Sequence, residues 1–155
     1  ISAFNNSNMP KNLTFSIIGH PKDEVERLKA FVTNNKLNKK IKVLHRLRRE
    51  SAIAEIQKSS IGLLINTDDN LHSIQYTSPL KYFEYLYAGL KVVAVDFQSH
   101  HDLPFSENII FYEINNENSF VNSLIQAFGA ESPSIKNIEI ITLDHRAEKI
   151  YNFIK

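Results

Sequence analysis

The sequence predicts a single α/β domain in which a parallel sheet lies between layers of helices. Short runs of consecutive apolar residues alternate along the chain with amphipathic stretches of helix length. The apolar runs have no polar face, which is typical of strands that helices cover on both sides. We therefore expect strands near residues 14–19, 41–44, 61–65, 92–95 and 109–112.

The stretches between these runs supply the helical crossovers that consecutive parallel strands require. Ser78 and Pro79 suit the N-cap and first position of one of these helices, and Gly89 suits the left-handed residue that ends it. Together these elements predict a Rossmann-like domain over residues 1–155. The expected helices cover residues 22–34, 50–59, 79–88 and 119–128, and a last one runs from Leu143 to the end.

Composition narrows the functional classes. The chain has 155 residues and a formal net charge of +1, which gives no general attraction to nucleic acid. It has no cysteine, which excludes disulfides and thiolate metal sites and fits a reducing, cytoplasmic compartment. No apolar run has the length of a membrane span. Because the chain begins with Ile1, we expect it to be a piece of a longer protein.

Three segments are candidates for binding, because ligands of such sheets collect beyond the carboxyl ends of strands. They are residues 45–49, 66–78 and 96–102. In the helix after the second segment, Lys81 lies in the first turn, where the helix dipole disfavours a cation unless an anion is bound. Ser78, Lys81 and Glu84 share one stripe of this helix. Alternatively, Lys81 and Glu84 form a surface ion pair and Ser78 only caps the helix.

The sequence of residues 77–96, TSPLKYFEYLYAGLKVVAVD, resembles the segment SPLKLFEYMAAGKPVVATD of family-4 glycosyltransferases with the GT-B fold. Residues 13–19, 56–65 and 144–150 resemble, in the same order, the second strand, a later strand and a late helix of that family's C-terminal domain. The resemblance implies the donor-binding half of a two-domain retaining enzyme. The family's first strand, which is central to its sheet and carries an arginine and a lysine that clamp the diphosphate, is expected before Ile1.

The resemblance also implies a reaction. The enzyme would move a sugar from a nucleotide-diphosphate sugar to a glycan or lipid-linked acceptor, in bacterial surface polysaccharide synthesis. No metal or other cofactor would be required. The N-terminal half would hold the acceptor and several catalytic groups, so this half alone is expected to bind the donor without transferring the sugar. Peripheral membrane association of the full-length protein stays open.

The resemblance assigns donor-binding roles residue by residue, and no catalytic residue. Glu84 matches the second glutamate of the family's Glu-x7-Glu signature, which binds the nucleotide ribose, whereas Tyr76 stands where the first glutamate would be. Residues 77–81 would face the diphosphate and sugar, and residues 45–46 the base and phosphates. Besides Glu84, the expected donor-binding residues are Thr77, Ser78, Pro79, Leu80, Lys81, His45 and Arg46.

Other polar and aromatic groups have simpler interpretations. Asp68, Asp69 and His72 are expected in a polar loop that orders over the donor. The sequence His100-His101-Asp102 suggests a metal site only weakly, since adjacent histidines lack further ligands, and no metal is expected. The aromatic residues expected in core and helix packing rather than in a sugar platform are Tyr82, Phe83 and Tyr87.

Two further functions stay open. A nucleotide-sugar epimerase of GT-B type would need acid and base residues of its own. A non-catalytic domain of the response-regulator receiver type shares the layered topology. It would need an acidic pair after its first strand and a lysine after its last, which residues 19–21 and 113–115 do not supply.

Overall fold

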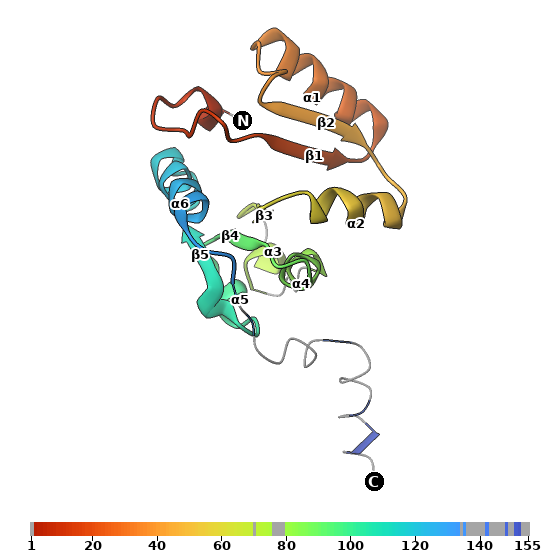
Figure 1. The fold of residues 1–155 in the computed structure, drawn as a ribbon, viewed down its shortest axis with the longest axis vertical. Coiled ribbons are helices and arrows are strands. Elements are labelled where there is room, and N and C mark those ends of the chain that lie inside the picture. The colour runs from red at the N-terminus through yellow and green to blue at the C-terminus, as the bar shows by residue number, and fades with distance from the viewer. Residues whose placement is uncertain are drawn as a thin grey trace. The chain divides into compact units, whose positions relative to one another are not determined.

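The chain forms two compact units, Ile1–Lys58 and Ser59–Lys155. Both are α/β, with parallel strands and helices in alternation (Figure 1). The prediction of one domain over residues 1–155 stays a prediction. The computed structural model describes residues 2–69, 71–75, 80–133, 135, 142, 148 and 151–152, with the backbone alone at residues 2, 5, 72 and 73.

The first unit is a two-stranded parallel sheet with a long helix packed on it. Strand β1 pairs with β2 from Phe15 opposite Ile41 to Gly19 opposite His45. Helix α1 contacts both strands and buries Val25 and Val32, because its apolar residues recur at helical spacing. The elements are the 3-10 helix η1 (Ser2–Asn5), β1 (Phe15–Gly19), α1 (Lys22–Asn34), β2 (Ile41–His45) and α2 (Arg49–Gln57).

The second unit contains a three-stranded parallel sheet in the order β3-β4-β5. Strand β4 pairs with β3 from Lys91 opposite Ile61, and with β5 from Val92 opposite Ile109. The elements are β3 (Ile61–Leu64), α3 (Leu71–Gln75), α4 (Leu80–Tyr87), β4 (Lys91–Val95), α5 (Gln98–His101), the 3-10 helix η2 (Ser106–Asn108), β5 (Ile109–Tyr112) and α6 (Glu117–Gly129).

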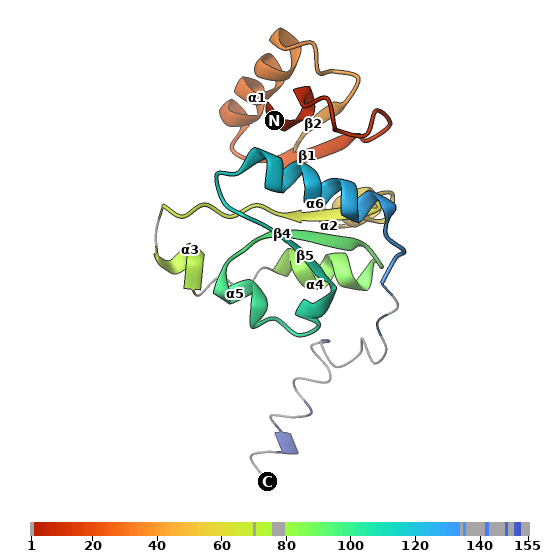
Figure 2. The same ribbon diagram turned by 90° about the vertical axis from the view of Figure 1, so that its left-hand side faces the viewer.

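Helices cover both faces of this second sheet. Helix α4 packs on β3 and β4, whereas α6 packs on β4 and β5, and Figure 2 shows the two helices on opposite sides of the strands. Residues 92–95 of β4 are at most 1% exposed. This burial explains why β4 has apolar side chains on both faces, as the sequence predicts for a covered parallel strand.

The predicted elements are largely confirmed. All five strands form within one or two residues of the expected bounds, and helices form at each of the four expected places before residue 130. Gly89 ends α4 with φ 73°, as predicted, and the N–H of Leu90 donates to the Tyr85 carbonyl at 2.9 Å. Ser78 and Pro79 lie outside the described residues. Of the last predicted helix, only residues 148, 151 and 152 are described, and they are helical.

Some elements were not predicted. Residues 71–75 form α3 inside the segment interpreted as a loop, and α5 and η2 follow β4, because such short helices carry too few residues to show a period. Helix α6 begins two residues earlier than expected, since the side chain of Asn116 accepts a hydrogen bond from the N–H of Ser119 at 3.0 Å. Within the described residues, no helix combines the length and apolarity needed to cross a lipid bilayer.

Among the described residues, each sheet has two edge strands, β1 and β2 in the first and β3 and β5 in the second, and the backbone groups on the unpaired side of β1 and β3 can be assigned. In the described residues, β2 is the one strand paired with β1, and β4 is the one strand paired with β3. The Phe15 N–H donates toward β2, so the backbone groups of residues 16 and 18 face the other side. The Lys91 N–H donates to the Ser60 carbonyl at 3.1 Å, so residues 61 and 63 face the open edge of β3.

Candidate functional site

Helix α4 has a packed face and an open face. Tyr82 and Leu86 are 0% and 2% exposed, and the Tyr82 hydroxyl donates to the Pro104 carbonyl at 2.7 Å. Burial raises the pKa of the Tyr82 phenol, and the negative charge of Glu107 adds to the effect. Lys81 is exposed and Glu84 is half-buried, so both lie off the packed face. This geometry leaves the Lys81 side chain accessible to a ligand and the Glu84 side chain partly accessible.

Glu84 lies beside an aromatic ring that fixes the helix on the sheet. Tyr85 packs against the backbone of Gly62 in β3. Burial raises the pKa of the Tyr85 phenol, and the Glu84 carboxylate raises it further. Glu84 is therefore close enough to Tyr85 to interact with it electrostatically. No ion pair between Lys81 and Glu84 is found among the described residues, so the surface-pair alternative has no support in them.

The start of α4 lies at the carboxyl edge of the second sheet. The chain leaves β3 at its carboxyl end, passes through α3, and then returns along α4 to the amino end of β4 (Figure 2). Leu80 and Lys81 thus lie at the edge where ligands of α/β sheets bind, and Leu80 is 78% exposed. Thr77, Ser78 and Pro79 lie outside the described residues, as does Tyr76.

His45 and Arg46 belong to the first unit, whereas Lys81 and Glu84 belong to the second. His45 ends β2, and its Nε2 is 2.8 Å from the Lys29 ammonium and 2.8 Å from a Glu26 carboxylate oxygen. One ring nitrogen either accepts from Lys29 or donates to Glu26, so the two contacts exclude each other at any instant. The hydrogen bond from Lys29, with a smaller contribution from His45, lowers the pKa of the Glu26 carboxyl. This cluster was not predicted from the sequence, although Glu26 and Lys29 have the i, i+3 spacing of a helix pair.

An open hollow of about 620 Å³ lies over α1 and the two strands of the first unit. Its walls include Ile17, Val43 and Phe31, and the Phe31 side chain is 48% exposed. None of the predicted donor-binding residues lines it.

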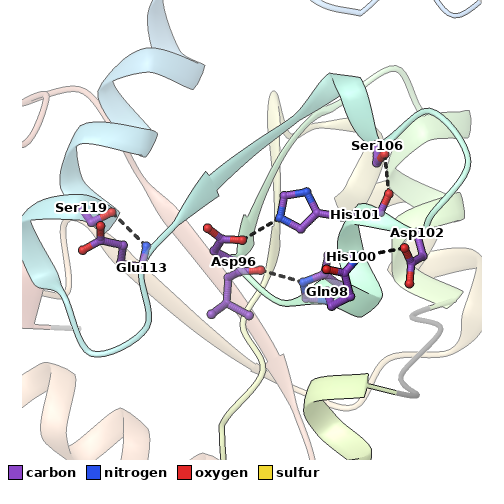
Figure 3. Close-up of polar contacts among 9 residues, drawn as sticks. Asp96, Gln98, His100, His101, Asp102, Ser106, Glu113 and Ser119 are labelled. Atoms are coloured by element: carbon purple, nitrogen blue, oxygen red, sulfur yellow. Dashed lines mark hydrogen bonds and ion pairs between the residues drawn. The ribbon is translucent and has the colours of Figure 1, made fainter.

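The adjacent histidines after β4 face different surroundings (Figure 3). The His100 ring is fully buried, its Nδ1 is 2.8 Å from the Val95 carbonyl, and its Nε2 has no partner in the described residues. The His101 ring is partly exposed, and its Nε2 is 2.6 Å from an Asp96 carboxylate oxygen. The two rings therefore do not face a common ligand. In the described part of the chain, no three side chains of metal-binding type converge.

Of the predictions for the aromatic and loop residues, some are confirmed and others are wrong. Tyr82 and Phe83 belong to the core cluster, as predicted, but Tyr87 is 74% exposed, so its assignment to packing was wrong. It lies one residue past the buried Leu86, on the solvent side of α4. Asp68 and Asp69 are exposed, as expected of a polar loop. His72 lies in α3 rather than in a loop, and its side chain is not described.

The chain was compared with known protein families, curated proteins and solved structures. No protein-family model, no curated protein and no solved structure matches it.

Proposed function

We propose that this chain is the donor-binding domain of a family-4-type GT-B glycosyltransferase and binds a nucleotide-diphosphate sugar at the start of α4. One observation carries the proposal. The residues that resemble the family, 77–96, include a helix that starts at the carboxyl edge of a parallel sheet and leads into its central strand. Open α/β sheets bind their ligands at this edge.

Lys81 and Glu84 have the chemistry for the two polar parts of a nucleotide. A bound phosphate would offset the unfavourable position of the Lys81 ammonium in the first turn of a helix. The Glu84 carboxylate is an acceptor for the two neighbouring hydroxyls of a ribose. The Lys81 side chain is exposed and the Glu84 side chain is half-buried, so both are at least partly open to a ligand, which supports this assignment.

The open sheet edges are compatible with the family assignment. The resembling family has one further strand, central to its sheet. A central strand has two neighbours, so without it two strands would each keep one open edge. In the described residues β1 and β3 each have a single strand partner, as β2 and β5 also do, so the pairing leaves room for such a strand without singling out its neighbours.

In the proposed enzyme, the sugar passes with retention to a glycan or lipid-linked acceptor held by a second domain. The product would contribute to a surface polysaccharide. The chain of residues 1–155 contains the donor-binding part of that reaction, so by itself it is expected to bind donor and transfer no sugar. The resemblance assigns Arg46 and His45 to the phosphates and the base, and an arginine fork suits a diphosphate.

Backbone amide shifts during titration test the proposed site. UDP, GDP and ADP are added separately to the ¹⁵N-labelled chain, with the matching nucleosides as controls for the phosphate contribution. We expect shifts at residues 80–84 with at least one diphosphate and much smaller shifts with its nucleoside. Shifts confined to the amino ends of the strands, near Ile61 and Ile109, would contradict the proposal.

A further inference from the structure

A histidine is held in one orientation at the carboxyl end of the central strand of the second sheet. Asp96 follows β4 directly, and its carboxylate is 2.6 Å from Nε2 of His101 at the end of α5. The imidazole stacks on the Phe111 ring of β5, with centroids 4.0 Å apart and planes 19° from parallel. The Ser106 hydroxyl donates to the His101 carbonyl at 2.7 Å (Figure 3). The carboxylate and the aromatic ring together fix the ring plane, and the Ser106 contact holds the backbone of His101.

This arrangement selects the ring nitrogen that is offered to a ligand. A carboxylate only accepts, so Nε2 carries the hydrogen that Asp96 receives. In the neutral imidazole Nδ1 then has a lone pair and acts as an acceptor. No partner for Nδ1 is found among the described residues, and the His101 side chain is 44% exposed. The neighbouring His100 differs, since its Nδ1 contacts the Val95 carbonyl in the interior.

The acceptor nitrogen lies at the same edge of the sheet as the start of α4. Asp96 marks the carboxyl end of β4, and α4 begins at that edge because it runs antiparallel to the strands (Figure 2). Helix α3, which leads toward α4, contacts α5. The Asp96–His101 pair therefore belongs to the edge where the proposed donor would bind.

We propose that His101, oriented by Asp96, accepts a hydrogen bond from a hydroxyl of the donor's sugar. This inference rests on the proposed function. A sugar hydroxyl donates to a lone pair, whereas a phosphate oxygen is itself an acceptor and would be repelled by the Asp96 carboxylate. Lys81 is assigned to the phosphate and Glu84 to the ribose, so the sugar, which residues 77–81 are also expected to face, is the hydroxyl-bearing group assigned to this pair.

The test compares nucleotide-diphosphate sugars with their parent diphosphates by calorimetry. The probes are UDP-glucose, GDP-mannose and ADP-glucose, each against UDP, GDP or ADP. The His101→Phe variant retains a ring that stacks on Phe111 but has no acceptor nitrogen. The Asp96→Asn variant presents an amide that allows the other histidine tautomer. Asp102→Asn is the matched control, since this exposed carboxylate binds Gln98 on the same turn.

We expect His101→Phe and Asp96→Asn to weaken binding of the preferred sugar nucleotide about two- to tenfold, the effect of one neutral hydrogen bond. The parent diphosphate should bind each variant as it binds the wild type, and Asp102→Asn should change neither ligand. In the ¹⁵N imidazole spectrum of the unliganded wild type, His101 should show the tautomer protonated at Nε2. A merely structural role would not produce a loss specific to the sugar.

Three results would overturn the inference. A wild-type chain that binds diphosphates and their sugars equally well would have no sugar contact, although the proposed function would survive. Equal weakening of both ligands by His101→Phe would place the contact at the base or phosphates. Absence of binding of every probe to the wild type would overturn both this inference and the proposed function.

Discussion

Gly62 of β3 lies directly under the ring of Tyr85 of α4, so that a β-carbon at position 62 would overlap ring atoms. The absence of a side chain at Gly62 lets α4 approach the sheet closely. Glu84 precedes Tyr85, so the same contact helps to position the carboxylate of the proposed donor site. The proposed site therefore depends on the close packing of α4 against β3 at Gly62.

Gly62→Ala should destabilise the fold by about 1–3 kcal/mol, the usual cost of overpacking a core, because the Tyr85 ring must move. Urea unfolding measures the change. Gly129→Ala is the control, since a β-carbon there meets nothing within 4 Å. If Gly62→Ala combined with Tyr85→Leu lost as much stability as the sum of the two single variants, the contact would not be the cause.

Tyr82→Phe should lower the free energy of unfolding by about 0.5–1.5 kcal/mol near neutral pH, because it removes the 2.7 Å hydrogen bond to the Pro104 carbonyl.

The effect of this substitution on stability should also depend on pH. Burial raises the pKa of this phenol, so above about pH 10 the unfolded chain ionises before the folded one and stability falls. The variant lacks this effect at position 82. The difference in unfolding free energy between wild type and variant should therefore shrink from about pH 8 to about pH 11. A constant difference over that range would contradict this account of Tyr82.

Hydrogen exchange should distinguish the two sides of each edge strand. The amides of Ile61 and Leu63 face the open edge of β3 and should exchange markedly faster than those of Gly62 and Leu64, which face β4. In β1, Ser16 and Ile18 should exchange faster than Ile17. Equal protection of both sets at a low protein concentration would mean that another segment covers these edges.

The sequence was sufficient for the elements whose residues form a regular pattern. The apolar runs of β3, β4 and β5 identify covered strands, and Gly89 identifies the end of α4. Contacts between distant residues were not predictable in this way. Nothing in the spacing of His100 and His101 indicates that one ring turns inward to Val95 while the other binds Asp96.

The candidate site was predictable only in part. The three-residue spacing of Lys81 and Glu84 places both on one stripe of α4, where Lys81 is exposed and Glu84 is half-buried. The cluster of Glu26, Lys29 and His45 depends on the register of β1 with β2, which a single sequence does not specify. The role of Arg46 and His45 beside the donor stays a prediction, because these residues belong to the first unit and Lys81 and Glu84 to the second.

Calorimetry on Glu84→Ala tests the central claim most directly. The wild type, Glu84→Ala and the control Glu131→Ala, an exposed glutamate after α6, are titrated with the diphosphate that shifts residues 80–84 and with its 2′-deoxy form. Losing the charged hydrogen-bond acceptor should cost about 1.5–3 kcal/mol, which weakens binding about ten- to a hundredfold. The wild type should prefer the ribose form, Glu84→Ala should bind both forms alike, and Glu131→Ala should match the wild type. Equal affinity of wild type and Glu84→Ala for both forms would contradict the assignment of Glu84 to the ribose.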